Sequence, residues 1–162
     1  MRLRAVVAAL ALAMASAATL PGAASAAPGD DEPAATVDLD FAAGKAAIKA
    51  KNWNAANTAL SSAALRDTRN ADIQNYLGYA YRHTGQMELA FKHYGRALQL
   101  DPRHRGAHEY MGEAYLMVGN LAKAEEHLAA LRRICLLPCE ELADLEREIT
   151  AYRQRSGVGR SP

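Results

Sequence analysis

The chain is poor in aromatic residues and carries almost no excess charge. Only 6% of its 162 residues are aromatic, whereas half are hydrophobic and alanine is abundant. Because alanine favours helices and runs of β-branched residues are few, we expect packed helices and no sheet. The formal net charge is +1, and without Arg2 and Arg4 the basic residues fall from 19 to 17 against 18 acidic ones. A nucleic-acid-binding protein would need a basic surface, so this function class is not expected.

Sequence motifs for catalysis are also missing. The chain has no glycine-rich phosphate loop, no Gly-x-Ser-x-Gly elbow and no Ser/His/Asp set that a repeat fold would bring together. His104 and His108 stand four residues apart, as in half of a zinc-protease motif, but Arg105 occupies the place of the catalytic glutamate. We interpret both histidines as exposed surface residues. We therefore expect a protein that is not an enzyme and has no cofactor or metal.

The first 26 residues predict a secretory signal peptide. Arg2 and Arg4 precede the uncharged stretch 5–20, and small residues at 24–26 fit cleavage after Ala26. The apolar run, about 16 residues long, is shorter than the roughly 20 residues that a membrane-spanning helix needs. An uncleaved membrane anchor is the alternative interpretation. We expect a periplasmic or secreted protein with no stable membrane insertion after cleavage.

Two segments, one on each side of the central region, are predicted to be flexible. Residues 27–36 combine two prolines, a glycine and three acids without an apolar period. Residues 156–162 form a similar tail. The folded part is therefore expected between them.

A repeat of 34 residues organises this central part. A shift by 34 aligns residues 76–81 (YLGYAY) with residues 110–115 (YMGEAY). The same shift matches Gly44 with Gly78, Gly85 with Gly119, Ala90 with Ala124 and His93 with His127. A fixed period of this length indicates stacked helix pairs.

The middle repeat, residues 71–104, has apolar residues at helical spacing in both of its halves. They are Leu77, Ala80, Tyr81, Leu89, Ala90, Tyr94, Ala97 and Leu98. Gly85 marks the turn between two helices, and Pro102 ends the second. We expect Gly78 and Ala90 to let the two backbones approach closely.

This pattern resembles the tetratricopeptide repeat. The middle repeat carries the family motif and departs from it at Gln74, where the family prefers Trp. Its matching residues are Leu77, Gly78, Tyr81, Ala90, Ala97 and Pro102, with Tyr94 in place of Phe. Residues 105–138 keep part of the motif, and residues 37–70 are degenerate. The resemblance implies an all-α, right-handed solenoid of about three helix pairs. A capping helix over 139–155 is expected to cover its open end, which is a structural role.

The resemblance also implies a concave groove that binds a peptide or partner segment. The groove positions carried over to this chain are Phe41, Lys45, Ile48, Lys49, Asp72, Asn75, Tyr79, Arg82, His83, Glu109, Glu113, Leu116 and Met117. The lysines and Arg82 predict a basic part and the two glutamates an acidic part. We therefore expect an adaptor or scaffold that binds a protein segment of mixed charge, anchored by apolar contacts. A segment held by the basic part alone, an ordinary solvated surface, and end-to-end self-association are the other hypotheses.

Cys135 and Cys139 are the only cysteines. In an exported protein such a pair predicts a disulfide. We expect Pro138 to end the preceding helix, with Cys135 in its last turn and Cys139 at the start of the capping helix. A C-x-x-x-C pair can also present two thiolates to a soft metal ion, so a small metal- or thiol-handling envelope protein is the alternative function.

Overall fold

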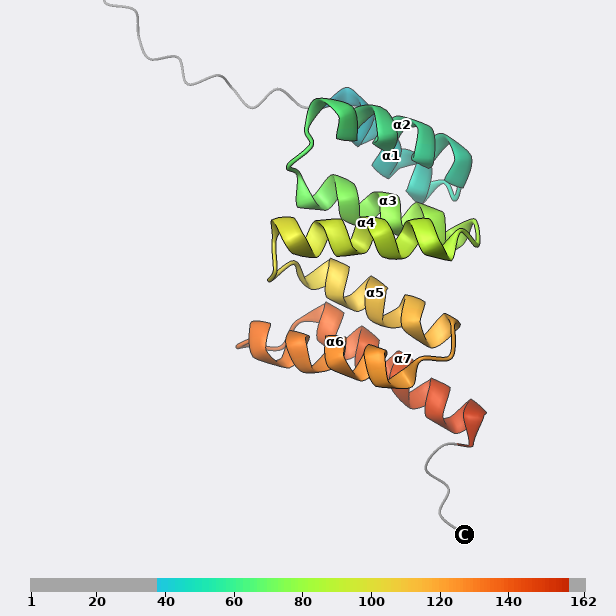
Figure 1. Ribbon diagram of the computed structural model, residues 1–162, viewed down its shortest axis with the longest axis vertical. Helices are drawn as coiled ribbons and strands as arrows, with labels where there is room; N and C mark the ends of the chain where they lie inside the picture. Colours follow the sequence, from blue (N-terminus) through green and yellow to red (C-terminus); the bar gives the residue numbers. More distant parts are fainter. Residues whose placement is uncertain (1–37, 158–162) are drawn as a thin grey trace, which may run out of the picture. The chain divides into compact units, whose positions relative to one another are not determined.

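The computed structural model describes residues 38–157, which form seven α-helices and no strand (Figure 1). They are α1 (Leu39–Lys49), α2 (Trp53–Arg66), α3 (Ala71–His83), α4 (Met87–Leu100), α5 (Arg105–Met117), α6 (Leu121–Ile134) and α7 (Glu140–Ser156). The predicted signal peptide, the predicted linker 27–36 and residues 158–162 lie outside the described residues. Between residues 38 and 157, no helix combines the length and the apolar character needed to cross a membrane.

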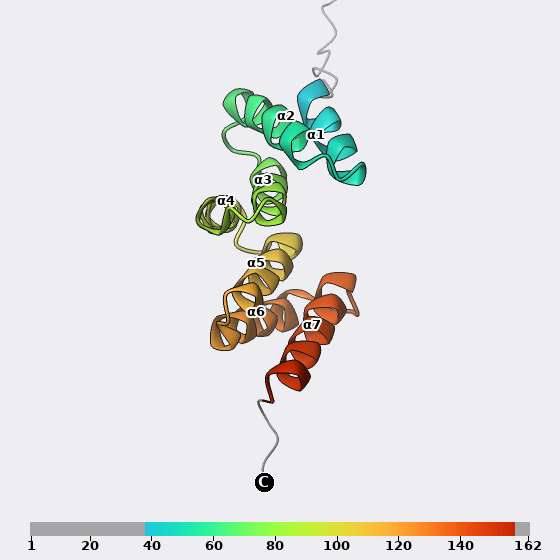
Figure 2. The same cartoon turned by 90° about the vertical axis from the view of Figure 1, so that its right-hand side faces the viewer.

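The helices are arranged as consecutive antiparallel pairs in two layers. α1 packs on α2, α3 on α4 and α5 on α6, and neighbouring pairs meet through α2 with α3 and α4 with α5. Figure 2 shows α2, α4 and α6 on one side of the stack and α1, α3, α5 and α7 on the other. α7 packs against both helices of the last pair. The expected all-α repeat solenoid is therefore confirmed.

Polar side chains at the helix starts explain several of the boundaries. The side chains of five N-cap residues accept hydrogen bonds from backbone N–H groups of the first turn: Asp38, Asn52, Asn70, His104 and Asn120. These bonds satisfy N–H groups that have no partner within the helix. The caps of α2, α3, α5 and α6 each follow a short connection, so the chain reverses direction with few residues between helices.

The turn inside each pair requires a left-handed backbone at one position. Gly85 and Gly119 adopt φ values of 74° and 78° there. The equivalent position of the first pair holds Lys51, with a φ of 56°. A side chain destabilises this conformation, which glycine adopts freely. This is one physical sense in which the first repeat is degenerate.

A glycine in the first helix of each pair makes room for a large side chain. A Cβ atom on Gly78 would lie 2.6 Å from ring carbons of Tyr94 on α4, so Gly78 faces Tyr94 and not the expected Ala90. The same position in α1, Gly44, faces Leu60 on α2. In α5 the neighbour changes: Gly112 faces Leu145 on α7. The last helix therefore fills the space beside this glycine.

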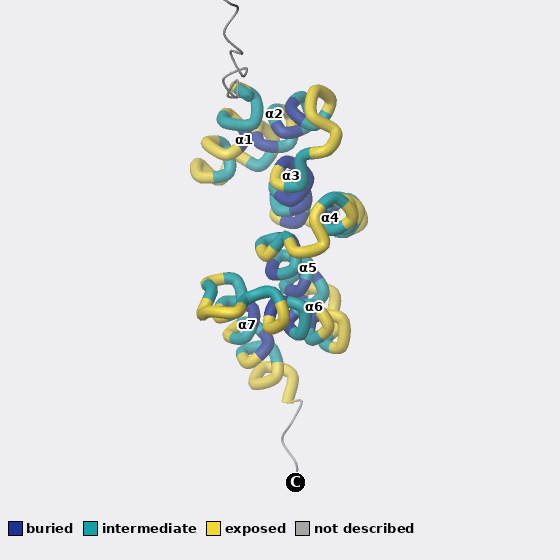
Figure 3. The backbone as a smooth tube through the Cα atoms, turned by 90° about the vertical axis from the view of Figure 1, so that its left-hand side faces the viewer, coloured by how far each residue is buried: buried dark blue, intermediate teal, exposed yellow. Residues whose placement is uncertain are grey.

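The apolar core runs along the contacts between helices and not through one central mass. Buried residues gather where the helices face one another (Figure 3). Among the seven helices, α3 has the most buried residues. The largest fully buried side chains are Leu60, Ile73, Leu77, Tyr94, Leu131, Leu145 and Ile149. Because each cluster joins only neighbouring helices, stability depends on nearest-neighbour contacts, as in repeat proteins generally.

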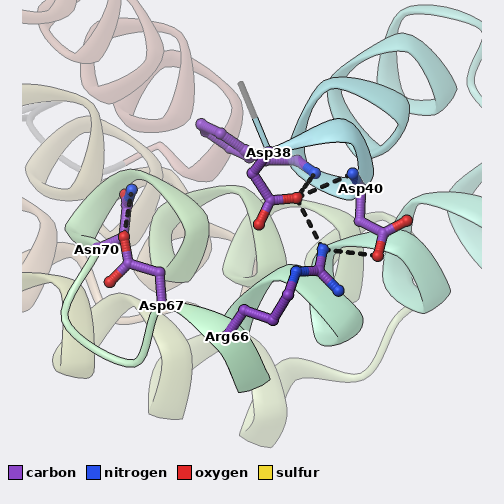
Figure 4. A network of polar contacts seen from close by, with 6 residues as sticks. Asp38, Asp40, Arg66, Asp67 and Asn70 are labelled. Carbon is purple, nitrogen blue, oxygen red and sulfur yellow. Dashed lines mark hydrogen bonds and ion pairs between the residues drawn. The ribbon is translucent and has the colours of Figure 1, made fainter. Parts of the chain in front are cut away.

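An exposed ion-pair network joins the start of α1 to the end of α2. Asp38 Oδ1 accepts hydrogen bonds from the backbone N–H groups of Asp40 and Phe41 and from Arg66 Nη2, the last at 2.8 Å. Arg66 also binds Asp40 Oδ2 at 2.6 Å (Figure 4). The two ends of the first helix pair are thereby connected across the surface.

Cys135 and Cys139 are joined in a disulfide, with their Cα atoms 6.0 Å apart. α6 ends at Ile134, so Cys135 is the C-cap residue and does not lie in the last turn as expected. The helix ends four residues before Pro138, because Cys135 already has an extended backbone. Cys139 is the N-cap of α7. The bridge therefore joins the end of α6 to the start of α7.

Candidate functional site

Two clefts lie along the face formed by α3, α5 and α7, and we call this face the groove. The acidic cleft, of about 300 Å³, is lined by Asp72, Asn75, Tyr76, His104, Gly106, Glu109, Tyr110, Glu140, Glu141 and Asp144. The mixed cleft, of about 450 Å³, is lined by Tyr79, Arg82, His83, Glu113, Leu116, Met117, Glu148, Tyr152 and Arg155. The acidic cleft lies toward the N-terminal ends of the three helices and the mixed cleft toward their C-terminal ends.

His104 helps to build the rim of the acidic cleft. Its Nδ1 accepts a hydrogen bond from the backbone N–H of Ala107 at 3.1 Å, and its Nε2 lies 3.0 Å from Asp72 Oδ1. Because Nδ1 accepts, the neutral ring carries its proton on Nε2 and donates it to Asp72. The expectation of an exposed surface histidine is wrong for His104, since α5 begins one residue later and uses this side chain as its N-cap.

Glu109 is the deepest carboxylate of the acidic cleft. The residue is 7% exposed. Burial, followed by the carboxylates of Glu113, Asp144 and Glu141, raises the pKa of Glu109 to about 8 against a smaller opposing effect of Arg82. At neutral pH the side chain is therefore mostly protonated.

An ion pair and the ring of Tyr79 form the floor of the mixed cleft, and Tyr110 of the acidic cleft lies against the same guanidinium group. Arg82 on α3 pairs with Glu113 on α5, and the residue is 9% exposed. Its guanidinium carbon lies 5.2 Å from the ring centre of Tyr79 and 5.6 Å from that of Tyr110. A planar cation suits both contacts, because it stacks on aromatic faces while its N–H groups bind carboxylate. The floor is thus held in one arrangement.

A ladder of aromatic rings continues from this floor toward the first helix pair. Tyr79 lies 4.8 Å from Tyr110 and 4.5 Å from His83, measured between ring centres. His83 then stacks on Trp53 at 4.2 Å with nearly parallel rings. Burial lowers the pKa of His83, and the nearby charges of Arg82 and Lys51 act in the same direction. The neutral ring is therefore the form that stacks at neutral pH.

The structure distributes the predicted groove residues between the two clefts. Asp72, Asn75 and Glu109 line the acidic cleft, and six others line the mixed cleft: Tyr79, Arg82, His83, Glu113, Leu116 and Met117. Lys45 and Lys49 are exposed on α1 and line neither cleft. The Lys45 ammonium instead lies 4.5 Å from the ring centre of Phe41.

The sequence interpretation missed one wall of the groove and one member of the aromatic ladder. α7 contributes lining residues to both clefts, among them Glu141 and Tyr152, so it does more than cover the end of the stack. Glycine at 112 was an available signal, because it admits a neighbouring side chain. Trp53 was missed because it begins α2, a second helix, which the family pattern does not place in the groove.

The remaining histidines pack in pairs with other polar side chains. His93 Nδ1 lies 2.8 Å from Gln74 Oε1, so these residues fill together the position where the family prefers Trp. His108 Nδ1 lies 2.9 Å from His127 Nδ1, and burial followed by the charge of His108 lowers the pKa of His127 to about 4. His108 is therefore partly buried and not the exposed residue expected. Among residues 38–157, no three His, Cys, Asp or Glu side chains are placed to hold a metal ion.

Comparison with known proteins agrees with this arrangement. The profile described as tetratricopeptide repeat matches residues 71–104. Residues 71–104 therefore match one tetratricopeptide repeat. Comparison of the whole sequence with curated proteins finds no significant match.

Several solved structures share the repeat protein's fold. The type III secretion translocator chaperone SycD of Yersinia enterocolitica is 19% identical, with a TM-score of 0.67 over 76% of this chain and 87% of that chain. PcrH in complex with the chaperone-binding region of PopD is 21% identical, with a TM-score of 0.66 over 75% of this chain and 93% of that chain. The TPR2B domain of yeast Sti1, in a pHsp70 complex, is 18% identical, with a TM-score of 0.67 over 73% of this chain and 96% of that chain. At these identities the likeness establishes the fold alone.

Proposed function

We propose that the protein is a non-catalytic adaptor that binds a segment of another protein in the groove. The observation that carries this proposal is the pair of open clefts on either side of a fixed floor of packed rings and the Arg82–Glu113 pair. Such a surface loses little conformational freedom when a partner binds, which favours affinity. Structures with this fold include PcrH with the chaperone-binding region of PopD and SycD with a peptide of YopD.

Met117, an exposed apolar residue of the mixed cleft, is expected to anchor the partner segment. Met117 is 61% exposed at the end of α5. A flexible thioether adapts to partner side chains of different shapes. Tyr152 on α7 and Leu116 lie beside it in the same cleft. An apolar side chain of the partner would be buried here.

Export and the disulfide belong to the same proposal. The predicted signal peptide supports a partner met in the periplasm or outside the cell, where the Cys135–Cys139 bridge is stable. The alternative of a metal- or thiol-handling protein has no observation in its favour, because the two sulfurs are bonded to each other. Self-association is a separate proposal, which sedimentation at several protein concentrations tests.

The test is a selection of random linear peptides on the purified protein, followed by affinity measurement with two matched variants. Met117→Asp and Val118→Asp alter neighbouring residues that are 61% and 51% exposed, but only Met117 lines the cleft. We expect Met117→Asp to weaken binding of selected peptides about tenfold or more, since it places a charge where an apolar side chain is buried. Val118→Asp should bind as the wild type does. Failure to select any peptide, or equal losses in both variants, contradicts the proposal.

A further inference from the structure

The acidic cleft holds one buried polar atom that no residue between 38 and 157 partners, and it also holds the buried side chain of Glu109. Asn75 is 4% exposed, and its Oδ1 atom is buried with no hydrogen bond. Glu109 is 7% exposed and is joined by no hydrogen bond or ion pair to another residue between 38 and 157. Buried polar groups are normally hydrogen-bonded, so the orphaned Asn75 oxygen in this cleft requires a reason.

The charges around these groups leave the cleft negative. Besides Glu109, four acidic side chains line it: Asp72, Glu140, Glu141 and Asp144. Among residues 38–157, arginines pair with two of them, since Arg105 lies 3.4 Å from Glu141 and Arg147 lies 2.8 Å from Asp144. Asp72 Oδ1 lies 3.0 Å from His104 Nε2. Elsewhere on α3 and α5, Arg82 is already neutralised by Glu113.

The side walls suit the stem of a long cationic side chain. Tyr76 on α3 and Tyr110 on α5 both line the cleft. Lysine and arginine bury their methylene stems against apolar surface while the charged head reaches polar groups. Aromatic rings add a favourable contact with the cation. Rings along the walls, the orphaned Asn75 oxygen and the carboxyl group of Glu109 therefore match one kind of ligand.

We propose that the acidic cleft receives a lysine or arginine side chain of the partner segment, whose charged head binds Glu109 and Asn75. This inference rests on the proposed function, because it names the chemistry that one cleft of the groove recognises. The partner segment then has two anchors, an apolar residue in the mixed cleft and a basic residue in the acidic cleft. The carboxylates of the rim attract the basic residue and disfavour segments that present an acid at this point.

The decisive comparison uses the peptide selection on three forms of the protein, with EDTA present to keep divalent ions from the carboxylates. Glu109→Gln removes the carboxylate while keeping the size of the side chain. Glu88→Gln makes the same change on the exposed face of α4, outside the groove. We expect wild type and Glu88→Gln to select peptides that share a lysine or arginine at one position, and Glu109→Gln to lose this preference.

Affinity measurements then isolate the contact. Replacing the shared lysine of a selected peptide by norleucine should weaken binding to the wild type about tenfold or more, and binding to Glu109→Gln less than twofold. Calorimetry of the wild type in buffers of different ionisation enthalpy gives a readout that needs no variant. Binding of the lysine peptide at pH 7 should release about one proton, because a cation stabilises ionised Glu109, whereas the norleucine peptide should release none.

The outcomes separate this inference from the function on which it rests. Selected peptides without a common basic residue overturn the cation site but leave the adaptor proposal standing. A basic preference that survives in Glu109→Gln, with no proton release in the wild type, also overturns it. If the library yields no binding peptide at all, both proposals fail.

Discussion

Arg82 on α3 pairs with Glu113 on α5, and its guanidinium also lies over the rings of Tyr79 and Tyr110. This ion pair connects two helix pairs, because α3 belongs to the second helix pair and α5 to the third. One side chain therefore connects the two repeats and forms the floor of the mixed cleft. A residue that looks like a free groove cation in the sequence is a fixed structural element.

Arg82→Ala should consequently destabilise the fold. Its loss leaves a partly buried carboxylate without a partner and removes packing against two rings, so the free energy of unfolding should fall by about 2–4 kcal/mol. The matched control is Arg66→Ala, which breaks two ion pairs of an arginine that is 53% exposed. That variant should lose much less stability, because exposed ion pairs contribute little. Urea unfolding followed by circular dichroism measures both, and equal losses would contradict the assigned role of Arg82.

Gly78→Ala should destabilise the second helix pair. The added Cβ would lie 2.6 Å from the ring of Tyr94, which is fully buried and has no room to move. We expect a loss of about 1–3 kcal/mol. Gly95→Ala in α4 is the control, since a Cβ there meets nothing within 4 Å. It should raise stability by about 0.5–1 kcal/mol through helix propensity. Thermal unfolding of the two variants should therefore shift in opposite directions.

Lys51→Gly should stabilise the first repeat. Lys51 has a φ of 56°, in the turn position that glycine occupies in the next two pairs. Removing the side chain relieves a strain of about 1 kcal/mol. Ala43→Gly, an exposed position in the interior of α1, should instead lower stability by about 0.5–1 kcal/mol. A lower melting temperature for Lys51→Gly would show that the left-handed backbone carries no such strain.

Glu109 should make stability fall as the pH rises. Its folded pKa of about 8 lies above the ordinary value of 4.5, so between these values the folded chain holds a proton that the unfolded chain has released. Each pH unit in this range lowers the free energy of unfolding by up to about 1.4 kcal/mol. Wild type and Glu109→Gln should be similarly stable at about pH 4.5, and the variant more stable by about 2–4 kcal/mol at pH 8.5. Urea titrations at the two pH values measure the difference, and a constant difference would contradict a buried, mostly protonated Glu109.

Reduction should loosen the joint between α6 and α7. The Cys135–Cys139 bridge closes a short loop, for which chain entropy predicts a contribution of about 2 kcal/mol. We expect dithiothreitol to lower the melting temperature of the wild type and to leave a Cys135→Ser/Cys139→Ser double variant unchanged. A thiol assay on protein isolated from its native compartment should find no reactive thiol before reduction. Two reactive thiols in that protein would instead favour the metal- or thiol-handling alternative.

The repeat architecture could be predicted from the sequence because it depends on local signals. The 34-residue period, the small residues at Gly44, Gly78 and Gly112 and the turn glycines all act between neighbouring elements. The same signals placed Tyr79 and Met117 on the first helices of their pairs, where the structure finds them lining one cleft. Side chains within one helix pair lie close in sequence, so periodicity is enough to align them.

Contacts between helices that are distant in sequence escaped this reasoning. His104 Nε2 lies 3.0 Å from Asp72 on α3, Gly112 faces Leu145 on α7, and α7 lines both clefts. None of these contacts has a local sequence signature, because each depends on how closely two helices approach and how they are rotated.

The sequence by itself determined the helices, their pairing and the face of the stack that each first helix presents. Only the tertiary structure decided which charges on that face remain unpaired. Arg82 and Glu113 neutralise each other across the groove, whereas Glu109 is buried among other carboxylates. The reason is physical: helix periodicity is a property of the chain, but the charge state and burial of a side chain depend on the neighbours that packing brings to it.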